Sequence, residues 1–196
     1  MHMDSKRHGF TLIEILIVIV VIGVLAAMMM FSSTEAEKSA RAQNIINNFN
    51  QIQKAVQSWY ADNMHRITTD GMDGSYVKYR IYDTNGKTKL AFKEFVQKRS
   101  GEIMKYLGNN PSIKLTGKED KTMKAGDYLL IDFHYKYWYV CYDTGTDKGL
   151  QSRLAGRASS MELRGFQDDK ITNNVVTNKN YTGGRYVCMS ILDLDK

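Results

Sequence analysis

The sequence predicts an α+β fold in which one long helix at the amino end lies on an antiparallel β-sheet. Three patterns support this prediction: an apolar run near the amino end, an amphipathic helical stretch after it, and alternating strand patterns near the carboxyl end. The length of 196 residues suits about one domain. A hydrophobic fraction of 43% and a charged fraction of 24% exclude a chain that is disordered throughout.

The apolar run extends from Phe10 to Phe31, and 19 of its 22 residues are apolar. As a helix it is about 33 Å long, which matches a hydrocarbon core of about 30 Å. We therefore expect residues 10–31 to cross a membrane once. Because Lys6 and Arg7 precede the run, the positive-inside rule keeps the amino end in the cytoplasm and the carboxyl-terminal domain outside it.

Glu14, the fifth residue of this run, is anomalous. A carboxylate within a membrane helix costs on the order of 2.5–3.5 kcal/mol, so it indicates a function and requires a partner. The alternative is an acid without a role at the membrane interface.

The residues around Glu14 follow a known pattern. A short basic leader ends at Gly9, Phe10 follows, Glu14 comes four residues later, and Gly23 and Ala26-Ala27 lie further along. This segment resembles the prepilin signature of type IV pilins and pseudopilins. The resemblance implies that a prepilin peptidase cleaves after Gly9 and that the new amino group of Phe10 is methylated. It also implies that Glu14 pairs with the amino terminus of a neighbouring subunit as a filament grows.

The resemblance implies a division of the chain into a leader at 1–9, a membrane and filament-core half-helix at 10–31, an amphipathic half-helix at 32–64 and a headgroup at 65–196 that packs with 32–64. Many pilins of this family have proline at the position of Phe31. Because no proline or glycine interrupts the chain there, we expect one helix from Phe10 to about Met64, about 80 Å long.

The amphipathic half carries its apolar residues at alternating steps of three and four. They are Ala42, Ile45, Phe49, Ile52, Val56 and Trp59. The opposite side is rich in amides rather than basic residues, so this stripe is expected to pack in a domain core.

The remainder of the chain predicts short elements. We expect a loop at 68–74, a strand at 76–82 closed by a turn at 83–86, and a broken helical region at 90–107. The strongest strand pattern is at 128–142, and a second strand is expected at 185–192 with a short one at 171–176. As a long helix on an antiparallel sheet with a disulfide-delimited terminal region, the arrangement resembles a pilin headgroup.

Cys141 and Cys188 lie on the two strongest strands. Pairing of these strands would bring the cysteines together, and export through the apolar segment would place them in an oxidising compartment, where a disulfide is expected. Such a bridge, across 188 − 141 = 47 residues, would stabilise the fold by roughly 4 kcal/mol. The alternative is two buried free thiols.

No catalytic constellation is present in the sequence, so we expect neither enzyme activity nor a cofactor or metal. The histidines, His2, His8, His65 and His134, lack metal-ligand spacing. The stretch 143–149 hints at a calcium loop, but Gly145 and Leu154 replace ligands that an EF-hand requires. A tight turn is expected there.

Three functions follow in order. The first is a structural subunit of a type IV pilus, serving surface attachment or motility. The second is a pseudopilin of a type II secretion system, which shares every amino-terminal argument. The third is a DNA-binding minor pilin, in which aromatic strand residues beside Lys78, Arg80 and Lys136 would stack on single-stranded DNA.

The expected partners are further copies of this chain, the prepilin peptidase, an inner-membrane assembly platform and, before assembly, the lipid bilayer. The expected location is the inner membrane as a single-pass protein, followed by an extracellular pilus. A net charge of +6 from 27 Lys+Arg and 21 Asp+Glu, with scattered basic residues, gives little support to nucleic acid as a partner.

Overall fold

The computed structural model describes residues 10–73, 76–81, 102–108, 110–117, 124–133, 137–166 and 176–194. These residues form two compact units, one ending at Ala40 and one beginning at Arg41. The first unit consists of the amino-terminal part of helix α1. The second holds the rest of α1 and every described strand.

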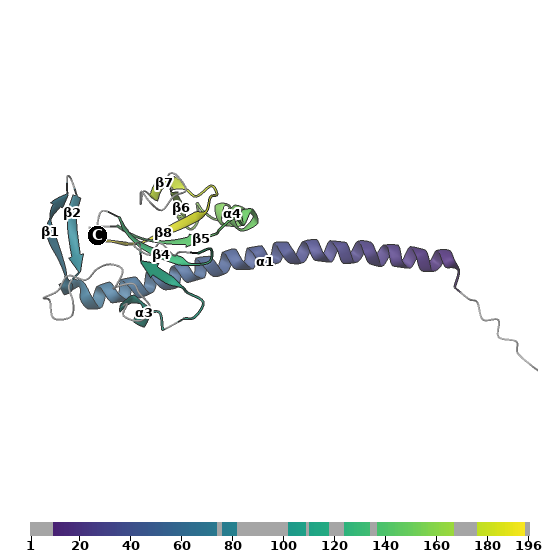
Figure 1. Ribbon diagram of the computed structural model, residues 1–196, viewed down its shortest axis with the longest axis horizontal. Helices are drawn as coiled ribbons and strands as arrows, with labels where there is room; N and C mark the ends of the chain where they lie inside the picture. Colours follow the sequence, from purple (N-terminus) through teal and green to yellow (C-terminus); the bar gives the residue numbers. More distant parts are fainter. Residues whose placement is uncertain are drawn as a thin grey trace, which may run out of the picture. The chain divides into compact units, whose positions relative to one another are not determined.

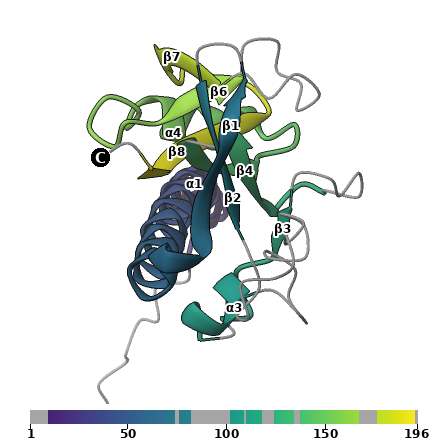
Figure 2. The same cartoon turned by 90° about the vertical axis from the view of Figure 1, so that its left-hand side faces the viewer.

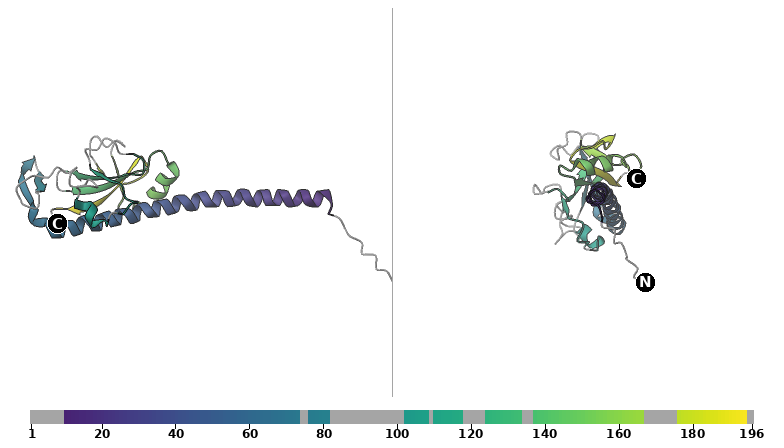
Figure 3. Two further views of the ribbon diagram at one scale, coloured as in Figure 1. Left: turned by 60° about the horizontal axis from the view of Figure 1, so that its bottom comes forward. Right: turned by 90° about the vertical axis from the view of Figure 1, so that its right-hand side faces the viewer.

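Helix α1 (Leu12–Asn63) is a single uninterrupted helix of 52 residues, visible as the purple-to-blue coil in Figure 3. The predicted helix is confirmed to within two residues at each end. The backbone stays helical at Gly23 and at Phe31, so neither position breaks the helix. A Cβ atom at Gly23 would meet no atom within 4 Å, so packing within one subunit does not require glycine there.

The amino-terminal part of α1 is apolar on all sides. Every large apolar side chain from Leu12 to Met30 has at least half of its surface exposed. A helix of this kind needs a surrounding apolar environment, either lipid or other helices.

Within the second unit, α1 is amphipathic and its apolar stripe is fully buried. Each stripe side chain is 4% exposed or less: Ala42, Ile45, Ile46, Phe49, Ile52, Ala55, Val56 and Trp59. The stripe packs on the sheet, where Trp59 stacks on Trp138 with ring centroids 5.9 Å apart. The predicted role of this stripe as domain core is confirmed.

The main sheet has six strands in the order β3-β4-β5-β8-β6-β7 (Figure 1). Its strands are β3 (Leu115–Gly117), β4 (Tyr128–Phe133), β5 (Tyr137–Asp143), β6 (Arg164–Phe166), β7 (Val176–Asn180) and β8 (Tyr186–Asp193). All pairs are antiparallel except β3 with β4, which is parallel. The predicted α+β architecture is therefore confirmed.

The two faces of the sheet bury different clusters, because successive strand residues point to opposite sides. Leu130, Val140 and Val187 belong to the large core shared with α1. The opposite face holds a smaller cluster: Leu129, Ile131, Cys141, Phe166, Val176, Tyr186 and Cys188. The alternation predicted for Trp138, Tyr139, Val140 and Cys141 agrees with these two clusters.

The strand predicted at 128–142 is wrong as a single element, because it is two antiparallel strands, β4 and β5. The period-two pattern continues through both and does not reveal where the chain reverses. A 15-residue strand would have exceeded the usual three to ten residues, and this length is the signal that should have divided it. The strand predicted at 185–192 corresponds to β8 and pairs with β5 as expected.

The loop predicted at 68–74 is also wrong. Residues Ile67–Asp73 form β1, which pairs antiparallel with β2 (Tyr76–Ile81) in a separate two-stranded ribbon shown in Figure 2. The register shifts between Thr69 and Met72, so Asp70 and Gly71 lie at a bulge. Bulges tolerate residues that normally indicate a loop, which explains the error.

Several short elements were only partly predicted. Of the helical region at 90–107, α3 (Glu102–Tyr106) is described, and residues 82–101, including the turn at 83–86, lie outside the described residues. Of the strand expected at 171–176, residues 171–175 lie outside them too, and β7 begins at Val176. Helix α4 (Lys148–Ala155), β6 and the 3₁₀ turn η1 (Met64–Arg66) were not predicted.

The carboxyl end of α1 is joined to α3 by a buried ion pair. Arg66 is 4% exposed and donates two hydrogen bonds of 2.8 and 2.7 Å to the carboxylate of Glu102. The indole N–H of Trp59 donates a third, at 2.7 Å. Burial alone would raise the pKa of Glu102, but the Arg66 and Trp59 hydrogen bonds and nearby positive charges outweigh it. The net result is a pKa below the ordinary value of 4.5.

We expect Glu102→Gln to lower the free energy of unfolding by about 3 kcal/mol, because it leaves the Arg66 guanidinium buried without its counter-charge. Urea unfolding followed by tryptophan fluorescence measures this loss. The control is Arg41→Gln, which removes an ion pair to Asp147 whose side chains are 49% and 27% exposed and should cost less than about 1 kcal/mol. Equal losses in the two variants would contradict a structural role for the buried pair.

The same pair predicts a pH dependence. Because the folded pKa of Glu102 is lowered, its stabilising contribution is present above the unfolded pKa and is lost as pH falls through the folded pKa. The stability difference between the wild type and Glu102→Gln should therefore shrink as the pH is lowered below about 4.5.

Candidate functional site

The amino end of α1 is built from the residues that the prepilin pattern singled out. Phe10 lies just before the helix and is 84% exposed. Thr11 is the residue that caps the helix, since its carbonyl accepts the first helical hydrogen bonds, from the N–H groups of Glu14 at 3.1 Å and Ile15 at 3.3 Å. The helix therefore begins one residue after the predicted amino-terminal pair.

Thr11 and Glu14 form a reciprocal capping box. The N–H of Glu14 donates to Oγ1 of Thr11 at 3.3 Å, and the N–H of Thr11 donates to Oε2 of Glu14 at 2.7 Å. The Thr11 hydroxyl donates a further bond to the same Oε2 at 2.8 Å. This arrangement satisfies amides at the helix start that would otherwise lack partners.

The capping box gives Glu14 a defined position in the single subunit. Both bonds end on Oε2, and Oε1 accepts no hydrogen bond from the described residues. One carboxylate oxygen therefore fixes the side chain while the other can accept a bond from a cation outside the chain. The sequence analysis missed the contribution of Thr11, although Thr-x-x-Glu before an apolar run is a recognised signal.

The apolar segment after this cap meets the requirements of a membrane span. Among the described residues, α1 is the one helix long and apolar enough to cross a bilayer, judged by length and composition. An inner-membrane anchor, as predicted for residues 10–31, is consistent with this finding.

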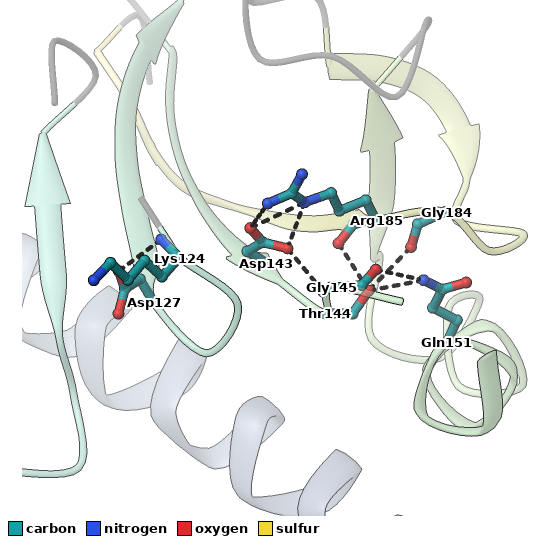
Figure 4. A network of polar contacts seen from close by, with 8 residues as sticks. All are labelled: Lys124, Asp127, Asp143, Thr144, Gly145, Gln151, Gly184 and Arg185. Carbon is teal, nitrogen blue, oxygen red and sulfur yellow. Dashed lines mark hydrogen bonds and ion pairs between the residues drawn. The ribbon is translucent and has the colours of Figure 1, made fainter. Parts of the chain in front are cut away.

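The stretch 143–149, considered for calcium, contains the predicted turn. The carboxylate of the fully buried Asp143 is bound by Arg185 through bonds of 2.7 to 3.1 Å and by the N–H of Gly145 at 2.8 Å (Figure 4). Gly145 has φ +61°, and a Cβ there would lie 2.9 Å from that of Ala125, so glycine is required at this turn. No group of three potential metal-ligating side chains occurs in the described part of the chain.

A polar network fixes α4 beside the end of β5. Asp147 caps α4 by accepting the N–H of Leu150 at 2.9 Å. The buried side chain of Gln151 donates to Thr144 Oγ1 at 3.1 Å and to the Gly145 carbonyl at 3.2 Å (Figure 4). Thr144 in turn donates to the Arg185 carbonyl at 2.8 Å. These contacts are structural and bind the connection after β5 to the start of β8.

The other residues weighed for chemistry are not brought into a site. His65 is exposed in η1, whereas His2, His8 and His134 lie outside the described residues. Lys78 and Arg80 belong to β2, and Lys136 lies outside the described residues. Stacking on single-stranded DNA therefore stays a prediction.

The predicted disulfide is present. Cys141 and Cys188 are direct partners in the register of β5 and β8, with Cα atoms 4.0 Å apart, and both sulfurs are bonded. Both cysteines are 0% exposed, within the small cluster on the sheet face opposite α1. The alternative of two free thiols is excluded.

Comparison with known proteins agrees with the prepilin pattern. Residues 4–30 match the model of the prokaryotic N-terminal methylation motif. The chain is 34% identical over 70 residues to the type II secretion system core protein G of Escherichia coli (strain K12), covering 36% of this chain and 48% of that protein. It is 30% identical over 76 residues to the protein of the same name from Dickeya chrysanthemi, covering 39% and 50%.

A third relative of the same name, from Klebsiella pneumoniae, is 31% identical over 66 residues, covering 34% of this chain and 47% of that protein. The chain thus spans about half the length of the curated relatives it matches. No solved structure matches it. The predicted resemblance to the type IV pilin and pseudopilin family is confirmed.

Proposed function

We propose that this chain is a pseudopilin of a type II secretion apparatus, cleaved after Gly9, methylated on Phe10 and assembled into a filament through its apolar helix. The observation that carries the proposal is the methylation motif at residues 4–30, together with relatives that are all named type II secretion system core protein G. The pseudopilin was the second hypothesis of the sequence analysis, and the comparisons favour it over the pilus subunit placed first.

Assembly follows from the two properties of the amino-terminal part of α1. Its apolar side chains are at least half exposed in the single subunit, and parallel packing with other copies would cover them when the subunit leaves the bilayer. The capped Glu14 would offer its second oxygen to the methylated amine of a neighbouring Phe10. In a low-dielectric environment that pair is favourable and an unpaired acid is costly, so the pair would fix the axial register.

Processing is tested first. Intact-mass analysis of the assembled protein should show loss of the nine residues Met1–Gly9 and one added methyl group on Phe10. Gly9→Val should leave an uncut precursor in the membrane, because a side chain at this position obstructs close approach of the peptidase to the backbone. Assembled protein that still carries the leader would contradict the proposal.

Assembly through Glu14 is tested by three substitutions. Glu14→Ala removes both the cap and the charge, and Glu14→Asp keeps the charge but misplaces it. Glu14→Gln is the matched control, since its amide oxygen can still accept the Thr11 bonds while the charge is lost. Loss of a desolvated pair costs about 3–5 kcal/mol, so Ala and Gln should both accumulate as monomers and Asp should be intermediate.

The readout is the ratio of filament to membrane monomer at equal protein level, measured by chemical cross-linking and shearing. If Glu14→Gln assembles like the wild type while Glu14→Ala does not, the carboxylate acts as a helix cap and not as an assembly charge. Normal filament yield from Glu14→Ala would remove Glu14 from assembly altogether.

The two filament classes are separated in cells that lack this chain. A pseudopilin predicts that proteins normally released into the medium are retained, while surface pili and attachment are unchanged. A pilus subunit predicts the reverse, together with dominance of this chain in sheared surface filaments. Loss of pili with normal secretion would overturn the proposed function.

A further inference from the structure

The Cys141–Cys188 bridge is inaccessible in the folded chain. Both residues are 0% exposed, and the cluster around them includes Phe166 from β6 and Val176 from β7. Thiol–disulfide exchange requires a thiolate to attack a sulfur directly, so a buried disulfide cannot react until its surroundings move. The bridge therefore cannot form or break while these side chains are in place.

The cover over the bridge is the weakly attached part of the sheet. We call the β6–β7 pair the cover; Phe166 and Val176 are register partners within it. It joins the rest of the sheet through two register pairs with β8, Arg164 with Cys188 and Gly165 with Val187. By contrast, β8 pairs with β5 over seven positions. Short edge elements with few contacts open locally at lower free energy than the core.

The order of events follows from the position of the cover in the sequence. Residues 164–180 lie within the 47-residue separation between the two cysteines. The strands β5 and β8 can pair and pack on α1 before this inserted segment docks, since their other face forms the large core. Figure 1 and Figure 2 show β6 and β7 on the side of the sheet away from α1.

We infer that the Cys141–Cys188 bridge is made by thiol–disulfide exchange before the cover docks, and that the docked cover then protects it from reduction. In the forming reaction the two cysteine thiols give up two electrons and two protons to a disulfide-bearing oxidant, which leaves as a dithiol. The oxidant is thus a partner of the open β5–β8 sheet and not of the finished fold.

The test is reduction of the full chain in detergent micelles by dithiothreitol. One thiolate of the reagent attacks a bridge sulfur and breaks the S–S bond, and its second thiol closes the ring, so the reagent is oxidised and two cysteine thiols are released. By microscopic reversibility, exchange in the two directions requires the same opening. Reduction is followed by mass after alkylation, and global stability by urea unfolding.

Two matched pairs of variants distinguish opening of the cover from global unfolding. Val176→Ala and Phe166→Leu weaken the cover, whereas Val140→Ala and Phe49→Leu weaken the opposite core by similar chemistry. Val140 is adjacent to Cys141 in sequence but faces the other side of the sheet. The cover variants should be reduced on the order of tenfold faster than their loss of global stability explains.

The core variants should be reduced faster only in proportion to their loss of global stability. If all four variants fall on one line of reduction rate against global stability, the bridge opens only with the whole fold and the inference is overturned. Reduction of the wild type as fast as an exposed disulfide would also overturn it. Neither result bears on the proposed filament function, because the test needs only the single subunit.

Discussion

One continuous helix has to satisfy two different environments, and the remaining structure depends on how it does so. From Leu12 to Met30 the helix is apolar on every side and buries almost nothing within the chain. From Ala42 to Trp59 it is amphipathic, and a stripe of small, aliphatic and aromatic residues supplies one wall of the domain core. No proline or positive-φ residue separates the two parts, so the change lies in side-chain pattern alone. A subunit built this way keeps a rigid backbone while its surroundings change from lipid to protein.

The sheet has a related difficulty, because a single helix covers only one of its faces. Trp59, Phe49 and Ile52 fill the space above that face, and burial of each such side chain contributes about 1.5–3 kcal/mol. The other face would remain exposed without the cover strands and the aromatic contact of Phe166 with Tyr186, whose ring centroids are 5.7 Å apart. This second cluster is small, and a covalent bond at its centre offsets its limited apolar area. The disulfide lies where packing alone stabilises least.

Much of this architecture could be predicted because it depends on periodicity. The helix, its buried stripe, strand β8 and the facing cysteines all follow from repeats of 3.6 or 2 residues. The reversal between β4 and β5 could not be seen, since alternation persists on both sides of it. Strand β1 was hidden by an Asp-Gly pair that sits at a bulge, and α4 by a Gly-rich stretch in which Asp147 is nevertheless a good helix cap. The Arg66–Glu102 pair joins residues 36 apart and has no local signal at all.

At the amino end, the pattern identified Glu14 but not the means by which it is held. An acid within an apolar helix is usually regarded as a charge waiting for a partner, which would make the free subunit unstable in a bilayer. The capping box changes this account, because Thr11 gives one carboxylate oxygen two short hydrogen bonds within the same turn. The group is therefore partly satisfied before assembly, and its remaining oxygen is still able to bind an amine. Local capping reduces the cost of keeping the charge in the membrane without removing the reason to assemble.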